Sequence, residues 1–258
     1  MSIKQTNGKP KENSSSGLPL LYKMPSTLDA ARHAQASIHN KADFSFAKTT
    51  NSLPINAIEF IEAVKNYPIV FTNDASPLPI AIVGLEQQNY FIKPDNSWQN
   101  GAYIPAYVRQ YPFIFFEHSA EEKKLYLCVD EVAPQFSATQ KDDASQLYTK
   151  DGKPTQFTNN ALKFCSDFYQ HHIITRNFCA DLKEHKLLKP YQSEITLSSG
   201  KKTKLSGFQM IDEKAVNSLS NEAYLSFRKK GWIPFIYFAL ASTSNWKNLV
   251  ELEAKLTA

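Results

Sequence analysis

The sequence has little glycine and lacks the motifs that glycine-rich loops support. Only eight glycines occur among its 258 residues, and no GxGxxG, GxxxxGKS/T or GxSxG pattern is present. The HExxH and paired CxxC patterns are missing as well. These absences exclude nucleotide-binding proteins, serine hydrolases and zinc enzymes that are defined by such motifs. The protein can still be an enzyme without a familiar motif.

Cysteine is scarce too, which excludes a disulfide framework. The chain has three cysteines, an odd number, and they lie far apart in the sequence. Cys128 stands among apolar residues in LYLCVDE, which predicts a strand. We interpret it as a buried, inert thiol, with a catalytic nucleophile as the alternative.

Strong net charge and long apolar runs are also absent. The net formal charge of +4 is too small to drive binding to a phosphate backbone, so we expect no nucleic-acid partner. The strongest apolar run, WIPFIYFALAS at 232–242, is far shorter than the roughly 20 residues that span a bilayer. Residues 1–17 lack the apolar core of a secretory signal and predict a disordered tail. We therefore expect a soluble cytoplasmic protein, with envelope association through a partner or through signal-less export as the alternative.

Two Tyr-Pro steps mark expected joints between helices and strands. AIEFIEAVKN predicts a helix, because Ile58, Ile61 and Val64 recur at helical spacing. The residue before a proline is pushed out of the α region, so this helix ends at the first Tyr-Pro step and the strand IVFT follows. AYVRQ likewise predicts a short helix that ends at Tyr111-Pro112, before the strand FIFFE.

The remaining elements predict an α+β fold. PIAIVGL and NYFIK predict one hairpin, KKLYLCVDE pairs with FIFFE, and SEITLSSGKKTKLSGFQMI predicts a second hairpin turning at Ser199-Gly200. A long helix is predicted over 159–188, and further helices over 213–230 and 234–256. We expect a mainly antiparallel sheet built from hairpins, packed by one long central helix and the C-terminal helices.

Residues 18–258 are expected to form a single domain after the tail. The hydrophobic content of 42% is enough to fill a substantial core. The polar segment 134–158, with its Asp151-Gly152 turn, is the best candidate for an internal boundary. Two sub-lobes, 18–133 and 159–258, joined by this polar loop are the alternative organisation.

A seven-residue spacing places Cys165, His172 and Cys179 on one stripe of the long helix. At 1.5 Å per residue the two cysteines lie about 21 Å apart along the axis. Zinc ligands lie about 2.0–2.3 Å from the metal, so these three side chains cannot share one ion. We predict that the stripe packs into the core, and we expect no metal and no cofactor.

Two carboxylates and an Arg-His pair are candidates for a binding site. Asp130 and Glu131 follow an apolar strand, where a carboxylate can bind a cation or serve as acid or base; a solvated turn is the alternative. Adjacent residues on a strand point to opposite faces, so only one of the two can serve a given site. Arg32 and His33 are charged residues in similarly distinctive surroundings.

Arg109 lies among tyrosines that recur every four residues, which places Tyr103, Tyr107 and Tyr111 on one face if the segment is helical. Such an arginine can stack on a ring or grip a carboxylate of a ligand. It can equally tie the short helix to the sheet through Asp130 or Glu131. The candidate binding residues are therefore Arg32, His33, Tyr103, Tyr107, Arg109, Tyr111, Asp130 and Glu131.

Seven stretches, spread in order along the chain, form a distinctive series. They are LPLLYKMPSTLDAARHA, DFSFAKTTNSLPINAIEF, YPIVFT, GAYIPAYVRQYPFIF, LCVDE, the Asp151-Gly152 turn and LSGFQMIDEKAVNSL. Together they resemble the bacterial SapC family, from about Leu18 to the final helix. The resemblance implies a bacterial source and a link to the cell envelope, because the family is associated with surface-layer loci and occurs near genes of TonB-dependent outer-membrane receptors. It supplies no catalytic residues.

Two functions follow as hypotheses. The first is a non-enzymatic binding or accessory protein of a cell-envelope pathway, either surface-layer or outer-membrane receptor. Its protein partner would be held by an exposed patch, either the tyrosines or the aromatic-rich end from Trp232 to Trp246. The alternative is an enzyme acting on an anionic small molecule, with Arg109 as anchor and Asp130 or Glu131 as acid or base. That enzyme requires Arg32, His33 and Arg109 to converge with a carboxylate in one pocket. The oligomeric state is not indicated by the sequence.

Overall fold

The structure is a computed structural model that describes residues 18–117, 124–197, 200 and 202–257. The predicted tail at 1–17 lies outside the described residues, as do the whole turn HSAEE between the two strands and the first residue of KKLYLCVDE. The chain divides into two compact units. Unit 1 comprises residues up to Lys41 together with Gln110–Ser166, and unit 2 comprises Ala42–Arg109 together with the residues from Asp167 onward. The single domain and the alternative sub-lobes stay predictions.

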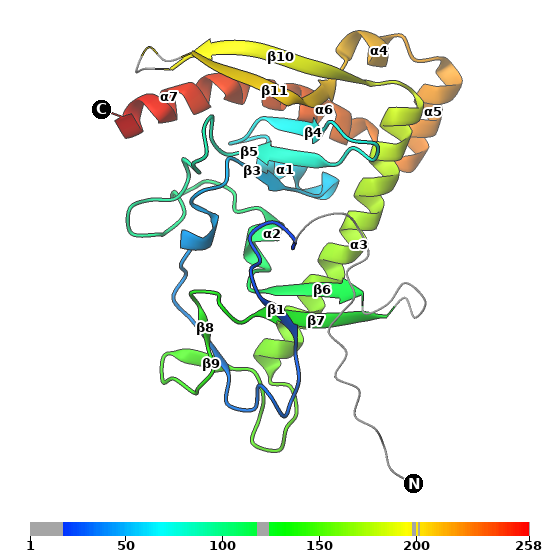
Figure 1. The fold of residues 1–258 in the computed structure, drawn as a ribbon. Helices are drawn as coiled ribbons and strands as arrows, with labels where there is room; N and C mark the ends of the chain where they lie inside the picture. Colours follow the sequence, from blue (N-terminus) through cyan, green and yellow to red (C-terminus); the bar gives the residue numbers. More distant parts are fainter. Residues whose placement is uncertain (1–17, 118–123, 198–199, 201, 258) are drawn as a thin grey trace. The chain divides into compact units, whose positions relative to one another are not determined.

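Unit 1 contains two small antiparallel sheets. The first has the order β1-β7-β6 and consists of β1 (Pro25–Thr27), β7 (Leu125–Asp130) and β6 (Phe113–Glu117). The second has the order β8-β2-β9 and consists of β8 (Phe136–Ser137), β2 (Ser37–His39) and β9 (Ala144–Gln146) (Figure 1). The predicted pairing of FIFFE with KKLYLCVDE is confirmed, since Phe113 opposes Val129. The polar segment 134–158 supplies β8 and β9.

The core of unit 1 includes the first turns of the long helix α3 (Gln156–Glu184). Phe157, Ala161 and Cys165 recur at four-residue spacing and so share one face of this helix. They pack with buried residues of both small sheets and the adjoining loops, namely Ala36, Ile38, Phe113, Leu127, Val129, Leu147 and Tyr148. The predicted long helix is confirmed, although it begins and ends a few residues earlier than expected.

Unit 2 is built on a five-stranded antiparallel sheet of the order β10-β11-β4-β5-β3. The strands are β10 (Leu188–Thr196), β11 (Lys202–Ile211), β4 (Ile69–Thr72), β5 (Pro79–Ile82) and β3 (Ser52–Pro54). The predicted hairpin is confirmed as β10–β11, with a register shift between Tyr191 and Ser193. Part of its predicted turn, Ser199, lies outside the described residues. The strand IVFT is confirmed as β4.

The predicted hairpin of PIAIVGL with NYFIK is wrong. Both edges of β5 are already occupied, because Ala81 pairs with Ile69 of β4 on one side and with Leu53 of β3 on the other. The intervening residues close a tight loop, in which the Gln88 N–H donates to the Glu86 carbonyl at 2.7 Å. A Cβ on Gly84 would lie 1.8 Å from the Gln88 carbonyl oxygen, so the loop requires glycine at this position.

The helix before the first Tyr-Pro step is confirmed, but the residues that predicted it do not form its buried face. It consists of η2 (Ala57–Glu59) and α1 (Phe60–Ala63). Phe60 is fully buried, and its ring centroid lies 6.1 to 6.5 Å from those of three core phenylalanines. Ile58 and Ile61 are instead 51% and 52% exposed. The aromatic ring determines the face, because its burial removes the largest apolar area from water.

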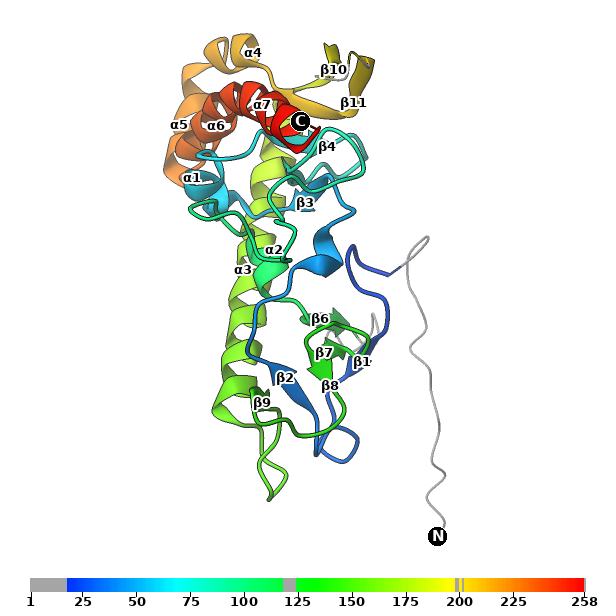
Figure 2. The same cartoon turned by 90° about the vertical axis from the view of Figure 1, so that its left-hand side faces the viewer.

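Helices complete unit 2. The predicted helix over 213–230 is interrupted, because Asp212 and Ser220 each accept a backbone N–H and cap separate helices, α4 (Glu213–Asn217) and α5 (Asn221–Lys230). After them come α6 (Ile233–Ala241), η3 (Ser242–Ser244) and α7 (Asn245–Thr257), and earlier in the chain lie η1 (Ser45–Ala47) and α2 (Ala106–Arg109). In Figures 1 and 2, α7 lies beside the β10–β11 hairpin.

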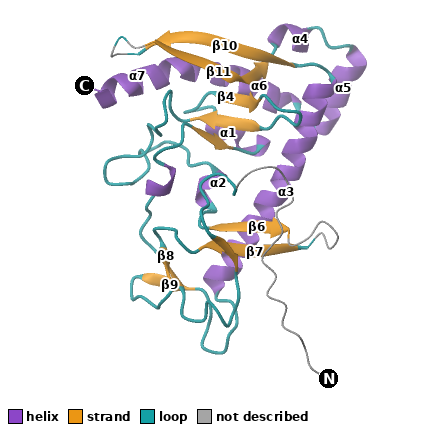
Figure 3. Ribbon diagram, in the orientation of Figure 1, coloured by secondary structure: helices purple, strands orange, loops and turns teal. Residues whose placement is uncertain are grey.

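The expected fold class is confirmed as α+β, with antiparallel sheets and the long helix α3 (Figure 3). The expected short second helix is confirmed as α2, which ends before the Tyr111-Pro112 step. No helix in the described part of the chain is both long and apolar enough to cross a membrane.

Candidate functional site

In unit 1, Arg32, His33 and Glu131 meet in one ionic cluster. The Arg32 Nη2 atom lies 2.6 Å from Glu131 Oε2, and the His33 Nε2 atom lies 3.0 Å from Glu131 Oε1. His33 is buried, and its Nδ1 accepts a hydrogen bond from the Asp29 N–H at 3.1 Å. The Asp29 carbonyl oxygen also lies 3.2 Å from Nδ1, and because an ionised carboxylate only accepts, the His33 Nε2–H donates to Glu131. The Arg32 side chain is 60% exposed, and the cluster reaches the surface through its guanidinium.

Asp130 makes a different set of contacts within the same unit. Its two carboxylate oxygens accept hydrogen bonds from the backbone N–H groups of Lys23 and Met24, each at 2.9 Å. The Tyr111 hydroxyl donates to Asp130 Oδ2 at 3.2 Å. Asp130 is fully buried, whereas its neighbour Glu131 is joined to the partly exposed cluster. The two adjacent carboxylates therefore have different partners and different access to solvent.

In unit 2, the buried carboxylate of Glu59 holds the segment that leads into α2. Glu59 Oε1 accepts from the Asn56 N–H at 2.7 Å, and Oε2 accepts from the Ala106 N–H at 2.7 Å and the Tyr103 hydroxyl at 2.9 Å. Burial raises the pKa of Glu59, and these hydrogen bonds act in the opposite direction. Burial and the neighbouring Glu59 carboxylate raise the pKa of Tyr103.

Glu59 is not among the candidate binding residues named from the sequence, where it is one polar residue of a predicted helix. The signal that identifies it is the capping box, since Asn56 caps the helix and Glu59 stands three residues later. A capping box predicts the contact with the Asn56 N–H. The contacts with Tyr103 and Ala106 depend on the tertiary fold.

Arg109 lies beside Tyr103. Its Nε donates to the Ile104 carbonyl at 3.0 Å and its Nη2 donates to the Tyr103 hydroxyl at 3.2 Å. The guanidinium carbon lies 5.7 Å from the centroid of the Tyr103 ring, which is within cation–π range. Through Tyr103, the exposed cation is connected to the buried carboxylate of Glu59. Asp130 and Glu131, the partners considered from the sequence, belong to unit 1.

The three regularly spaced tyrosines do not share a helical face. The helix α2 spans only Ala106–Arg109, so it contains Tyr107 alone. Tyr107 is 7% exposed and its ring lies 6.2 Å from that of Phe168, and burial raises its pKa. Tyr111 is also buried, with its ring 5.1 Å from that of Tyr22. Of the candidates, the structure thus joins Arg32 to His33 and Glu131, Tyr111 to Asp130, and Tyr103 to Arg109.

The aromatic-rich end from Trp232 to Trp246 packs largely into unit 2. Trp232 is 8% exposed, and its Nε1 donates to Asp181 Oδ2 at 2.6 Å. Trp246 stacks on Phe208 of β11 at a centroid distance of 5.7 Å. Tyr237 is the exception, because half of its surface is exposed.

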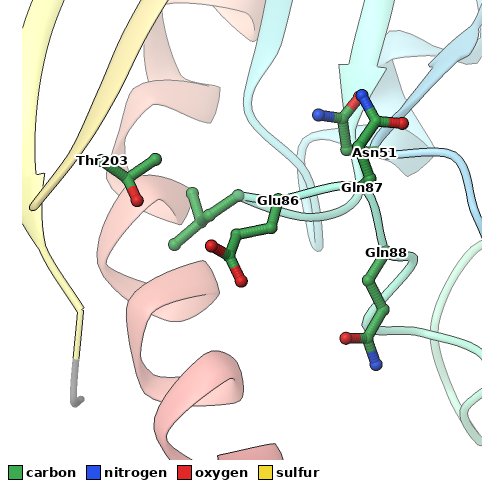
Figure 4. A pocket seen from close by; sticks show the side chains of 6 residues that line it. Asn51, Glu86, Gln87, Gln88 and Thr203 are labelled. Atoms are coloured by element: carbon green, nitrogen blue, oxygen red, sulfur yellow. The ribbon is translucent and has the colours of Figure 1, made fainter. Parts of the chain in front are cut away.

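Two adjoining hollows in unit 2 are lined by residues that sequence analysis did not select. The larger, about 620 Å³, is lined by Asn51, Leu85, Glu86, Gln87, Gln88 and Thr203. The smaller, about 240 Å³, shares Asn51 and Leu85 with the larger one and extends to Phe208 and Trp246. Figure 4 shows that the polar lining comes from three segments: Asn51 before β3, the loop with Glu86 to Gln88, and Thr203 on β11. The larger volume is within the roughly 300–1,000 Å³ of small-molecule sites.

The cysteine stripe of α3 packs inward, as predicted. Cys165 and Cys179 are each 2% exposed, and Thr175 on the same stripe is 1% exposed. Burial raises the pKa of both thiols to about 12 and also raises that of Cys128. Among the described residues, no group of three or more His, Cys, Asp or Glu side chains could hold a metal ion.

The native protein is expected to resist thiol reagents. At pH 8, a thiol of pKa about 12 is ionised about a thousandfold less than an unfolded cysteine, and only the thiolate reacts. Labelling with a chromogenic disulfide, with and without urea, followed by peptide mass spectrometry measures this for each cysteine. We expect labelling of all three only after unfolding. Rapid labelling of Cys128 in the native protein would instead favour the nucleophile interpretation.

Comparison with known proteins gives one match. The chain matches the model of the SapC family over residues 28–249 of its 258 residues. No curated protein and no solved structure matches the chain. The matched region includes the α3 stripe, the described hollows and all eight candidate residues. The chain therefore belongs to the SapC family.

Proposed function

We propose that this protein is a non-enzymatic accessory protein of a bacterial cell-envelope pathway that binds a protein partner. The observation that carries the proposal is a set of exposed isoleucines on two neighbouring elements of unit 2. Ile58 and Ile61 of the η2–α1 segment are 51% and 52% exposed, and Ile174 of α3 is 43% exposed. We call these three residues the isoleucine face.

The isoleucine face has a definite local geometry. Ile58 and Ile61 are three residues apart, so they lie on the same side of a helical segment. That segment is fixed next to α3, because the Ala57 N–H donates to Thr175 Oγ1 at 2.8 Å. Ile174 immediately precedes Thr175. Exposed large apolar side chains on adjoining elements are typical of a protein-binding surface.

The candidate binding residues fit a binding role better than an acid–base role. The carboxylate oxygens of Asp130 and Glu131 already accept hydrogen bonds from groups of unit 1. In this proposal, Arg32 and Arg109 present exposed guanidinium groups to acidic groups of the partner, while His33, Tyr103, Tyr107 and Tyr111 support their surroundings. The expected cytoplasmic location belongs to the same proposal and is tested by fractionating cells that express the protein at natural levels.

Charges placed on the isoleucine face are expected to abolish partner binding. In an Ile58→Asp/Ile61→Asp double variant, two carboxylates would have to be desolvated against the partner. The protein is purified gently from its own cells at low salt, and native mass spectrometry measures the fraction in complex. We expect a stoichiometric partner with the wild type and at least about a tenfold loss of complex with the double variant.

Leu225→Asp is the matched control, because Leu225 of α5 is 47% exposed and lies outside the isoleucine face. It should retain the partner, and circular dichroism should show that both variants remain folded. Equal partner recovery with the double variant would show that the isoleucine face is not the docking surface. Recovery of the wild type without any partner would contradict the accessory function itself.

A further inference from the structure

We propose that the two adjoining hollows of unit 2 form one saccharide-binding site. This proposal goes beyond the accessory function and does not depend on it, because none of the lining residues belongs to the isoleucine face. Four observations support it: the polar side chains of the lining, the unpaired indole N–H of Trp246, the fixed backbone of one loop, and the opposite charges of Glu86 and Lys204.

The lining of the larger hollow matches the hydrogen-bonding character of a sugar. Asn51, Gln87 and Gln88 carry side-chain amides, and Thr203 carries a hydroxyl. Each of these groups both donates and accepts hydrogen bonds, as sugar hydroxyls do. Within the described part of the chain, none of these four side chains is hydrogen-bonded to another residue. They are therefore available to a ligand.

The smaller hollow adds an aromatic surface with an unused donor. Trp246 lines this hollow and stacks on Phe208, which fixes the plane of its indole ring. Its Nε1–H is buried and has no hydrogen-bond acceptor among the described residues. Buried indole N–H groups ordinarily have a partner. The accessible part of the ring would pack against the C–H groups of a sugar, whereas the Nε1 atom has almost no accessible surface and would reach a sugar oxygen only if the indole shifts on binding.

The indole N–H groups of the other two tryptophans both have acceptors. The Trp98 Nε1–H donates to the Tyr67 hydroxyl at 3.2 Å, and the Trp232 Nε1–H donates to Asp181 Oδ2 at 2.6 Å. Trp246 is thus the tryptophan whose donor still lacks a described acceptor.

The loop that carries the two glutamines is held in place before any ligand binds. The backbone N–H groups of Val83 and Gly84 donate to the Asn51 carbonyl at 2.8 and 3.2 Å, and the Tyr90 N–H donates to the Val83 carbonyl at 2.9 Å. Leu85 is 5% exposed and anchors the loop from within. A backbone that is already fixed lowers the conformational entropy lost on binding, although the glutamine side chains themselves still have to be ordered by the ligand.

The charge of the lining indicates an uncharged ligand. Glu86 lines the larger hollow and Lys204 lines the smaller one, so a carboxylate and an ammonium group balance each other. A neutral hexose and an N-acetylated amino sugar share the required hydroxyl chemistry. The acetamido group of the second could additionally pair with an amide of the lining and place its methyl group against Leu85.

Nitrogen-15 NMR of the full chain tests the site through its three indole signals, which arise from Trp98, Trp232 and Trp246. A Trp246→Phe variant assigns the Trp246 signal by removing it. The protein is titrated separately with N,N′-diacetylchitobiose and with maltose. We expect a saturable shift of the Trp246 signal and unchanged signals from Trp98 and Trp232. Shifts with both sugars indicate recognition of hydroxyls, and a shift with diacetylchitobiose alone indicates recognition of the acetamido group.

Variants of the lining determine whether a shift reports the proposed site. Asn51→Ala and Gln88→Ala are each expected to raise the dissociation constant about tenfold, because each removes a hydrogen bond to the sugar. Gln170→Ala, which removes an exposed amide on α3, is the matched control and should leave the constant unchanged. The proposal is overturned if neither sugar shifts the Trp246 signal, or if both lining variants, still folded by their spectra, bind like the wild type.

Discussion

Replacing Glu59 with alanine is expected to lower the free energy of unfolding by about 3 kcal/mol, roughly 1 kcal/mol for each of three orphaned donors. The change removes the acceptor of the Asn56 and Ala106 N–H groups and of the Tyr103 hydroxyl. Glu59 is only 6% exposed, so water cannot freely replace the lost carboxylate. Urea unfolding followed by circular dichroism measures the loss.

Glu62→Ala is the matched control, since Glu62 lies in the same helical segment but is exposed, and among the described residues its side chain pairs only with Lys65, at 2.7 Å. An exposed pair three residues apart contributes about 0.5 kcal/mol or less. If both variants lose the same small amount of stability, the Glu59 contacts do not hold the α2 segment in place.

The pH dependence of stability gives a second test of Glu59, because burial raises its folded-state pKa above the unfolded value near 4.5. A raised carboxyl pKa means that the folded state binds the proton more tightly. The resulting stabilisation is full below the unfolded pKa and is lost as the pH rises through the folded pKa. Glu59→Gln has no such proton, so the stability of the wild type relative to this variant should fall from pH 4 towards neutrality. A relative rise would mean that the hydrogen bonds to the carboxylate outweigh its burial.

Local backbone rules predicted much of the fold. The proline rule correctly placed the starts of β4 and β6, because it depends only on neighbouring residues, whereas α1 ends at Ala63, four residues before Tyr67. The β10–β11 hairpin and the long helix α3 were likewise evident from alternation and length. The prediction of the first hairpin failed because strand pairing is not local. The edges of β5 are occupied by β3 and β4, and nothing within PIAIVGL indicates those partners.

The candidate site was harder to predict, because most of its contacts join distant positions. Arg32 and Glu131 are almost a hundred residues apart, and only the fold brings them to 2.6 Å. The tyrosine spacing suggested a helical face, but α2 is too short to contain it. The hollows combine Asn51, the loop at Gly84–Gln88 and a strand near residue 203, and no local pattern joins these segments. Glu59 alone had a local signal in its capping box.

Asp130→Asn is expected to destabilise the protein by about 2–4 kcal/mol, whereas Glu131→Gln should cost less than about 1 kcal/mol. Asp130 accepts from two consecutive backbone N–H groups, one on each carboxylate oxygen. An asparagine must turn its NH₂ group towards one of these donors, so that a buried N–H of Lys23 or Met24 loses its acceptor. This contact fixes the start of β1, where Pro25 opposes Asp130 in the register.

Glu131→Gln makes the same chemical change one residue later and is therefore a matched control. The glutamine carbonyl oxygen can still accept from the His33 Nε2–H, and the lost partner, Arg32, is 60% exposed and can be solvated. Thermal and urea unfolding of both variants measure the contrast. An Asp130→Asn variant of wild-type stability would mean that its carboxylate is not needed to hold β1, and the charge would then have to be retained for another task, such as the acid–base role. A large loss of stability for Asp130→Asn together with a small loss for Glu131→Gln would mean that Asp130 anchors β1, whereas Glu131 belongs to the ionic cluster whose exposed member is Arg32.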